Sequence, residues 1–240
     1  MVLLTKVTVI IGSPKMEKGN TSFVLAPFIK GMEEAGASVE LIFAKKLKIH
    51  PCIGCFKCWR ETIGECFQQD DMEELLTKLR ETNILVIATP TYAALPGELQ
   101  NILNRLVPLV EPILEFRDGR TRAKPHDDVK ITKIIGFFVG AWWELANLDV
   151  VAKIVEELTE LFSLELTDAV RRPHASLLRR ETDLNKSILQ RIEKVGYEFI
   201  TEGKIDKSDL EFIRQPLVKQ ADYLERGNQN YLKRKTEQNK

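Results

Sequence analysis

Continuous apolar runs rich in β-branched residues recur along the chain. Runs of this kind are typical of strands that are covered on both faces. The first run ends at Gly12-Ser13-Pro14, which indicates a turn. A fifth run is weaker and alternates between apolar and polar residues. The pattern therefore predicts five strands, at 6–11, 38–43, 84–88, 131–139 and 164–170.

Segments with apolar residues at helical spacing lie between these runs. They occupy 72–79, 99–106, 151–162 and 188–199, and a further amphipathic segment runs to about residue 34. Strands that alternate with helices favour an α/β fold, a three-layer sandwich in which helices cover both faces of a doubly wound parallel sheet. In such a sheet, ligands bind beyond the carboxyl ends of the strands.

The length and the charge of the chain narrow its domain organisation and its partners. A chain of 240 residues can bury one full core, so we expect one domain at 1–204 and a polar, partly helical extension at 205–240. Lys plus Arg and Asp plus Glu each total 35. Because the net charge is zero, no electrostatic attraction favours binding to nucleic acid or to an anionic membrane surface. A small molecule is therefore the favoured binding partner.

The apolar start of the chain is interpreted as a strand. It lacks a basic beginning and a small-residue cleavage site, and no run approaches the length of a membrane span. We therefore expect a cytoplasmic protein with no membrane partner. In a reducing cytoplasm, clustered thiols persist as thiolates or metal ligands rather than as disulfides.

All four cysteines of the chain fall within fifteen positions, as Cys52, Cys55, Cys58 and Cys66. They interrupt the alternation of strands and helices after the second predicted strand, so 50–68 is interpreted as an insertion at the rim of the sheet. Three thiolates at intervals of three, with a fourth from a short loop, complete the set that a [4Fe–4S] cluster requires. His50, two residues before Cys52, is placed to donate a hydrogen bond to a cluster sulfur.

Three alternatives remain for the cysteines. Disulfides between residues three apart would close small strained rings. Zinc accepts four thiolates, but its usual sites take two pairs that are set well apart. Free or switching thiols are the third alternative.

The segment 12–22 joins the first predicted strand to the following helix. A hydroxyl- and amide-rich loop in this position aims backbone N–H groups at a phosphate. The loop has neither the Walker lysine pattern nor Gly-x-Gly-x-x-Gly, so a terminal monophosphate is predicted. The alternative is that Thr21 or Ser22 only caps the helix. The candidate phosphate-binding residues are Ser13, Lys15, Asn20, Thr21 and Ser22.

Three segments together resemble one family. The loop 12–22, the segment Thr89-Pro90-Thr91-Tyr92 and the strand and helix alternation resemble the NADPH-dependent FMN reductase group of flavodoxin-like proteins. The cysteine segment, followed by Asp70-Asp71-Met72, is similar to the compact motif of iron–sulfur flavoproteins. The resemblance covers roughly the first 160 residues. It implies a flavodoxin-like FMN-binding domain with strand order 2-1-3-4-5.

The resemblance also implies where FMN would bind. The phosphate would lie on the candidate residues of the first loop, and the flavin ring on Pro90, Thr91 and Tyr92. A third loop, at Gly140, Ala141 and Trp142, would follow the fourth strand beside the ring edge, although adjacent tryptophans also serve packing. Relatives in this group form dimers or tetramers, so a homo-oligomer is expected.

FMN takes one or two electrons and a [4Fe–4S] cluster takes one, so a protein with both converts between the two kinds of electron transfer. This predicts an oxidoreductase that passes electrons from NAD(P)H or a reduced ferredoxin-like carrier to a small acceptor. The alternatives are a cluster-free FMN or quinone reductase and a flavodoxin-like carrier without turnover. No catalytic acid or base is assigned. A basic stretch, Arg117, Arg120, Arg122 and Lys124, is a candidate contact for an acidic carrier or for the 2′-phosphate of NADPH.

Overall fold

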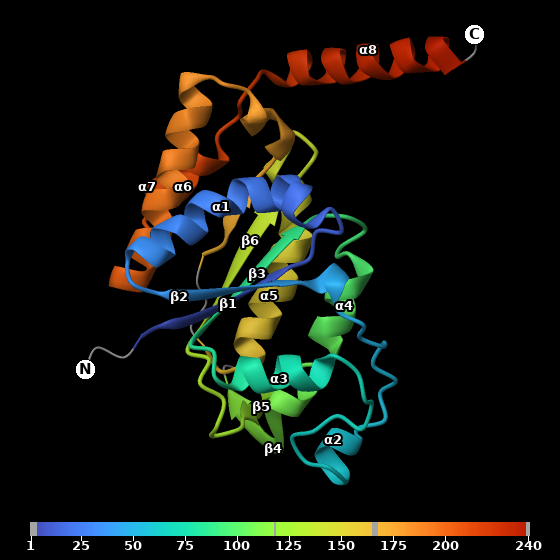
Figure 1. Ribbon diagram of the computed structural model, residues 1–240, viewed down its shortest axis with the longest axis vertical. Coiled ribbons are helices and arrows are strands. Elements are labelled where there is room, and N and C mark those ends of the chain that lie inside the picture. Colours follow the sequence, from blue (N-terminus) through green and yellow to red (C-terminus); the bar gives the residue numbers. More distant parts are fainter. Residues whose placement is uncertain (1–3, 118, 165–167, 239–240) are drawn as a thin grey trace.

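The computed structural model describes residues 4–117, 119–164 and 168–238 and shows a parallel sheet between two layers of helices (Figure 1). The strand order is β2-β1-β3-β6-β7, and all neighbouring strands are parallel. This is the flavodoxin order 2-1-3-4-5 that the resemblance implied, so the predicted α/β fold is confirmed. The strands are β1 (Lys6–Ile11), β2 (Ser38–Phe43), β3 (Ile84–Pro90), β6 (Lys133–Val139) and β7 (Val170–Arg172).

The bounds predicted for the last strand were wrong. Strand β7 begins at Val170, which pairs with Phe137. Of the predicted segment, residues 165–167 lie outside the described residues. Leu164 and Ala169 pack against the core without pairing to a neighbouring strand. At these two described positions the apolar residues of the pattern therefore mark packing against the core.

The strands alternate their side chains between two cores. On one face, Val9 and Val86 pack with α1 (Asn20–Glu34), α6 (Asp183–Glu202) and α7 (Lys207–Arg214). On the other face, residues such as Ile10 and Ile87 pack with three other helices. These are α3 (Met72–Arg80), α4 (Gly97–Asn104) and α5 (Asp149–Leu161). Because both faces are covered, the strands read as continuous apolar runs.

Helices α1 and α6 approach each other closely on the first face. A Cβ atom on Gly31 would lie 1.9 Å from the Glu193 carbonyl oxygen, and one on Gly196 would lie 2.1 Å from that of Phe28. The two glycines therefore allow backbone contact that no other residue permits. This packing fixes the C-terminal half of α1 against α6.

The structure adds a β-hairpin that the sequence did not predict. Strands β4 (Val110–Arg117) and β5 (Arg120–Pro125) pair antiparallel between α4 and β6. The hairpin carries the basic stretch. Its strands are short on core-facing residues, because most of their side chains are at least partly exposed. For this reason no apolar run in the sequence predicted these two strands.

Residues after α6 form helices. In α7, Leu210 and Ile213 are buried in the core with α1, whereas the described part of α8 (Gln220–Gln238) has no buried residue and extends from the body (Figure 1). Among the described residues, no helix combines the length and apolar character needed to cross a membrane. Short helical turns complete the chain: α2 (Lys57–Arg60), η1 (Met16–Lys18), η2 (Ala44–Lys46), η3 (Val107–Leu109), η4 (Leu145–Leu148) and η5 (Ala175–Arg179).

Candidate functional site

Three loops meet at the carboxyl edge of the sheet. Gly12 N donates to Ala88 O at 2.8 Å, so the ends of β1 and β3 are joined. Thr91 N donates to Val139 O at 3.2 Å, which joins the ends of β3 and β6. The predicted phosphate loop, ring loop and third loop therefore follow adjacent strands at one edge, where a doubly wound fold binds its ligand.

The phosphate loop is folded tightly before α1. Ser13 is buried, and a Cβ atom on Gly19 would lie only 2.7 Å from its Oγ. The Ser22 hydroxyl donates to Met16 O at 2.7 Å. Thr21 is 1% exposed, so its side chain packs inward.

Neither Thr21 nor Ser22 is the N-cap of α1. Helix α1 begins at Asn20, and its N-cap is Gly19, which makes no side-chain cap. Thr21 and Ser22 lie inside the first turn, where backbone N–H groups lack intrahelical partners. The helix start is left to an acceptor from outside the helix.

Arg179 is a residue of the site that sequence analysis missed. It reaches from η5 to donate from Nε to Asn20 Oδ1 at 2.9 Å, and its guanidinium lies 4.4 Å from the Phe23 ring centroid. Lys15 is exposed on the same loop. Cations at the positive end of a helix are unfavourable by themselves. The two cations and the helix start together favour a bound anion such as phosphate.

The ring loop carries one buried hydroxyl group and one exposed side chain. The Thr91 Oγ1 atom is buried and makes no hydrogen bond with any described residue. Tyr92 is 54% exposed, and its N–H donates to Ala94 O at 3.0 Å. Pro90 ends strand β3. An unpartnered buried hydroxyl is costly, so this position fits a ligand with polar ring atoms.

The third loop is held by the C-terminal part of the chain. Tyr223 donates its hydroxyl to Ala141 O at 2.6 Å, and Gly140 accepts from Ala175 N at 2.9 Å. The two adjacent tryptophans separate. Trp143 stacks on His174 and donates to Val218 O, whereas Trp142 is 65% exposed.

A cavity of about 390 Å³ lies beside Trp142 and the start of α8. Leu177, Val218 and Leu224 contribute apolar surface to it, and Arg180 contributes a charge. Sequence analysis missed this cavity, because its walls come from segments far apart in the chain.

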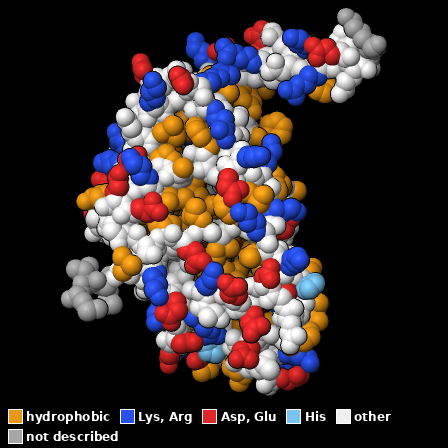
Figure 2. Space-filling model, in the orientation of Figure 1, with side chains coloured by type: hydrophobic (Ala, Val, Ile, Leu, Met, Phe, Trp, Pro, Cys, Tyr) orange, Lys and Arg blue, Asp and Glu red, His pale blue; other side chains and the backbone are white. Residues whose placement is uncertain are grey.

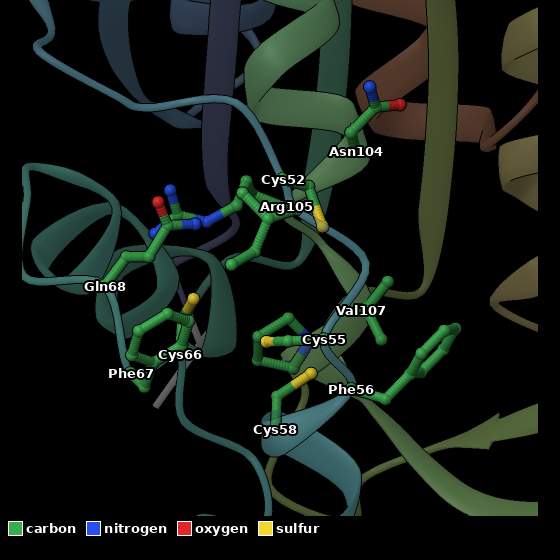
Figure 3. A pocket seen from close by; sticks show the side chains of 12 residues that line it. Cys52, Cys55, Phe56, Cys58, Cys66, Phe67, Gln68, Asn104, Arg105 and Val107 are labelled. Carbon is green, nitrogen blue, oxygen red and sulfur yellow. The ribbon is translucent and has the colours of Figure 1, made fainter.

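The four cysteines line one small cavity, with Phe56, Phe67 and Val107 among the apolar residues around them (Figure 3). Gly54 and Phe56 both have positive φ, at 67° and 54°, which folds the segment back on itself. Burial raises the pKa of the Cys58 thiol, and the neighbouring cysteines raise it further.

Across residues 4–117, 119–164 and 168–238, no three His, Cys, Asp or Glu side chains stand as a ready set of metal ligands. The chemistry of the donors still fits an iron–sulfur cluster. Four thiols share one cavity, and no carboxylate or imidazole is among its lining residues. Tetrathiolate coordination is what such a cluster uses.

A buried ion pair lies beside the cysteine cavity. Arg105 Nη1 lies 2.9 Å from Asp70 Oδ2, and Nη2 lies 3.1 Å from Asp70 Oδ1. Burial alone would raise the pKa of Asp70, but hydrogen bonds from Arg105, His50 N and Met72 N hold it below its usual value. The His50 Nδ1 atom also faces Asp70, at 3.1 Å, so this nitrogen is not directed at a sulfur as sequence analysis expected.

The basic stretch is largely compensated by carboxylates. Arg120 Nη2 pairs with Glu157 at 2.7 Å and Arg122 Nη2 with Glu160 at 2.7 Å, both on α5. The hydrogen bond from Arg120 lowers the pKa of Glu157 to about 2. Two of the four basic side chains are therefore paired with carboxylates of α5, and the contact of this stretch with an acidic carrier or NADPH stays a prediction. Figure 2 likewise shows acidic and basic side chains interspersed over the visible face.

Comparison with known proteins identifies the family. The model of the family described as NADPH-dependent FMN reductase matches residues 5–125, just over half of the chain. The chain belongs to the NADPH-dependent FMN reductase family.

The resemblance to iron–sulfur flavoproteins is also found among curated relatives. An iron–sulfur flavoprotein of Archaeoglobus fulgidus is 34% identical over 100 residues, which cover 41% of this chain and 44% of that protein. An iron–sulfur flavoprotein of Methanocaldococcus jannaschii is 33% identical over 105 residues, which cover 43% and 53%. The chain thus spans about half the length of the curated relatives that it matches.

Solved structures share the fold at low identity. An NAD(P)H:quinone oxidoreductase from Methanothermobacter marburgensis matches with a TM-score of 0.57 and 14% identity, covering 82% of this chain and 97% of that one. The azoreductase AzrA matches with a TM-score of 0.60 and 13% identity, covering 81% and 100%. At these identities the likeness concerns the fold.

Proposed function

We propose that the protein is an FMN-dependent oxidoreductase that carries a [4Fe–4S] cluster on its four cysteines. The observation that carries this proposal is the meeting of three loops at one edge of the sheet. One loop offers the start of α1 with cations beside it, and the next offers the unpartnered Thr91 hydroxyl. Family membership supports FMN as the ligand of this edge.

The residues of the first loop would bind the FMN phosphate. Backbone N–H groups of Asn20, Thr21 and Ser22 are free of intrahelical partners at the start of α1. Ser13 supplies a hydroxyl beside them. Lys15 and Arg179 supply positive charge, and the bond from Arg179 to Asn20 fixes the loop.

The other two loops would hold the flavin ring. Pro90, Thr91 and Tyr92 face the site from the end of β3, and the Thr91 hydroxyl would gain its missing partner there. Gly140, Ala141 and Trp142 come from the end of β6, and the exposed Trp142 offers an aromatic face beside the ring. FMN held there would supply hydride-accepting, two-electron chemistry toward a nicotinamide donor and one- or two-electron chemistry toward an acceptor.

Cys52, Cys55, Cys58 and Cys66 would hold the cluster. A cluster bound there supplies one-electron steps. The chain's own contribution is a small cavity in which Phe56, Phe67 and Val107 place apolar surface around the thiols. Helix α4 connects the two sites, because it begins after the ring loop and ends at Asn104, directly before Arg105. Its eight residues span about 12 Å at 1.5 Å per residue.

The proposed partners follow from this chemistry. The donor would be NAD(P)H or a reduced ferredoxin-like carrier, and the acceptor a small molecule such as a quinone. We also propose a homo-oligomer, a dimer or tetramer, and a cytoplasmic location. The structural relatives named for quinone and azo substrates show that this fold accommodates reductases of small molecules.

Anaerobic purification followed by analysis of cofactors tests the proposal. We expect flavin absorption with FMN released on denaturation, and iron and sulfide near four each per chain. Oxidation of NADPH or NADH in the presence of a quinone should follow enzyme concentration. A colourless protein that does not bind added FMN would refute the flavin assignment.

A cluster-free FMN or quinone reductase is the second candidate. It is favoured by the absence of a ready set of metal ligands among the described residues. Iron analysis distinguishes the two, because this candidate predicts full flavin occupancy and nicotinamide oxidation with no iron after anaerobic reconstitution.

A further inference from the structure

The ion pair beside the cysteine cavity is more deeply buried than ordinary ion pairs. The side chains of Arg105 and Asp70 are 1% and 2% exposed. Bringing two charges out of water costs several kcal/mol per ion, and apolar residues of similar size are often equally stable. Stability alone therefore does not explain why an arginine ends α4 at this place.

The guanidinium of Arg105 is fixed on one side and open on another. Nη1 donates to His50 O and to Asp70, each at 2.9 Å, and Nη2 donates to Asp70 at 3.1 Å. The Nε atom is also buried, yet it makes no hydrogen bond with any described residue. A buried N–H without an acceptor costs about 1–3 kcal/mol. An acceptor that comes within reach when the neighbouring cavity is occupied would remove this cost.

The cysteine cavity is where such an acceptor would lie. Arg105 lines this cavity together with all four cysteines (Figure 3). The arginine is therefore a cation among thiols, with one donor still available.

We propose that Arg105, held by Asp70, donates its Nε–H to a sulfur of the ligand set in this cavity and so stabilises the reduced cluster. The inference rests on the proposed cluster and concerns Arg105 as a positioning residue. A hydrogen bond and a positive charge beside the sulfurs both favour the more negative, reduced state, and so raise the reduction potential. Arg105 also ties the end of α4 to the segment that carries Cys66.

Redox titration of the reconstituted protein tests this role. In Arg105→Gln we expect the reduction equilibrium to shift at least tenfold toward the oxidised cluster, which is 59 mV for one electron. Arg105→Lys keeps the charge without the Nε donor. Its reduction potential should therefore lie between those of the wild type and Arg105→Gln. Loss of iron to a chelator should be faster in both variants. FMN content reports whether each variant is folded.

Arg60→Gln is the matched control. Arg60 lies in the same segment and donates to Cys55 O at 2.8 Å, but it is exposed. Arg60→Gln removes the same positive charge, but at a site where water screens it. The reduction potential should therefore change much less than in Arg105→Gln. Equal shifts in the two variants would overturn a specific role for Arg105.

Two further outcomes separate the possible failures. If Arg105→Lys keeps the wild-type potential and chelation rate, the Nε donor has no role and the inference is wrong. If the wild-type chain takes up no iron, the cluster assignment itself fails. Should Arg105→Gln not fold, the double variant Asp70→Asn with Arg105→Gln removes the unpaired carboxylate and is titrated instead, with the same expected shift.

Discussion

Removal of Arg179 gives the sharpest test of the phosphate loop. Its Nε donates to Asn20 at the start of α1, so Arg179→Gln removes both a charge and the contact that fixes the loop. Hydrogen bonds to charged groups contribute about 1.5–3 kcal/mol. Arg179 is exposed, so we expect about 1–2 kcal/mol, or roughly 5- to 30-fold weaker FMN binding.

The comparison of FMN with riboflavin isolates the phosphate. Riboflavin lacks the phosphate, so its dissociation constant should change little in Arg179→Gln, whereas that of FMN should rise. Fluorescence titration at low and high salt measures both, and the loss for FMN should shrink as salt increases because screening already weakens the wild-type contact.

Lys30→Gln serves as the control. Lys30 lies on the same helix, ten residues after Asn20 or about 15 Å along the axis, and pairs with Glu193. Its removal should leave FMN affinity unchanged. Equal weakening of FMN and riboflavin by Arg179→Gln, or none of either, would refute the reasoning that the start of α1 binds the phosphate.

Three further predictions concern stability and the ring loop. Burial and then the charge of Arg172 lower the pKa of His174 to about 4, whereas in the unfolded chain it is about 6.5. The unfolded state then binds the extra proton, so the free energy of unfolding should fall by roughly 3 kcal/mol as pH drops from about 6.5 to about 4. Denaturant titrations at several pH values check this, and His174→Gln should flatten the dependence. Gly31→Ala should destabilise the protein by about 1–3 kcal/mol, because the added Cβ would meet the α6 backbone. Gly227→Ala is the control and should not destabilise the protein, because its Cβ would lie in open space. Thermal melts compare the two variants. Thr91→Val should leave the flavin-free protein at least as stable, because it removes an unpartnered buried hydroxyl. The same variant should weaken FMN binding severalfold in the fluorescence titration. Unchanged affinity would argue against a contact between Thr91 and the flavin ring.

Sequence analysis predicted the sheet well because its signal is local. A strand covered on both faces is apolar throughout, as at Lys6–Ile11 and Ile84–Pro90, and each amphipathic helix marks its own buried side. The short last strand and the β4–β5 hairpin were misplaced or missed. Their residues are stabilised by distant partners, such as the acidic side of α5, rather than by a pattern of their own.

Some residues of the candidate site were predicted from the sequence, and others were found only in the structure. Ser13, Asn20 and the four cysteines stand out in the sequence, since clusters of hydroxyls or thiols in one short segment carry a chemical signal. Arg179 and Arg105 do not, because a single arginine in a helical segment resembles a solvated one. Both become informative only when Arg179 is seen to reach Asn20 and Arg105 to be buried against Asp70.

The sequence by itself determined the order of strands and helices, the loop chemistry after the first strand and the clustering of thiols, since these depend on residues close together in the chain. Only the tertiary structure decided which side chains are buried and which atoms lack partners. It revealed the open donor of Arg105, the unpartnered Thr91 hydroxyl and the compensated basic hairpin. The physical reason is that burial and hydrogen bonding depend on contacts between distant segments, and no local pattern of residues encodes them.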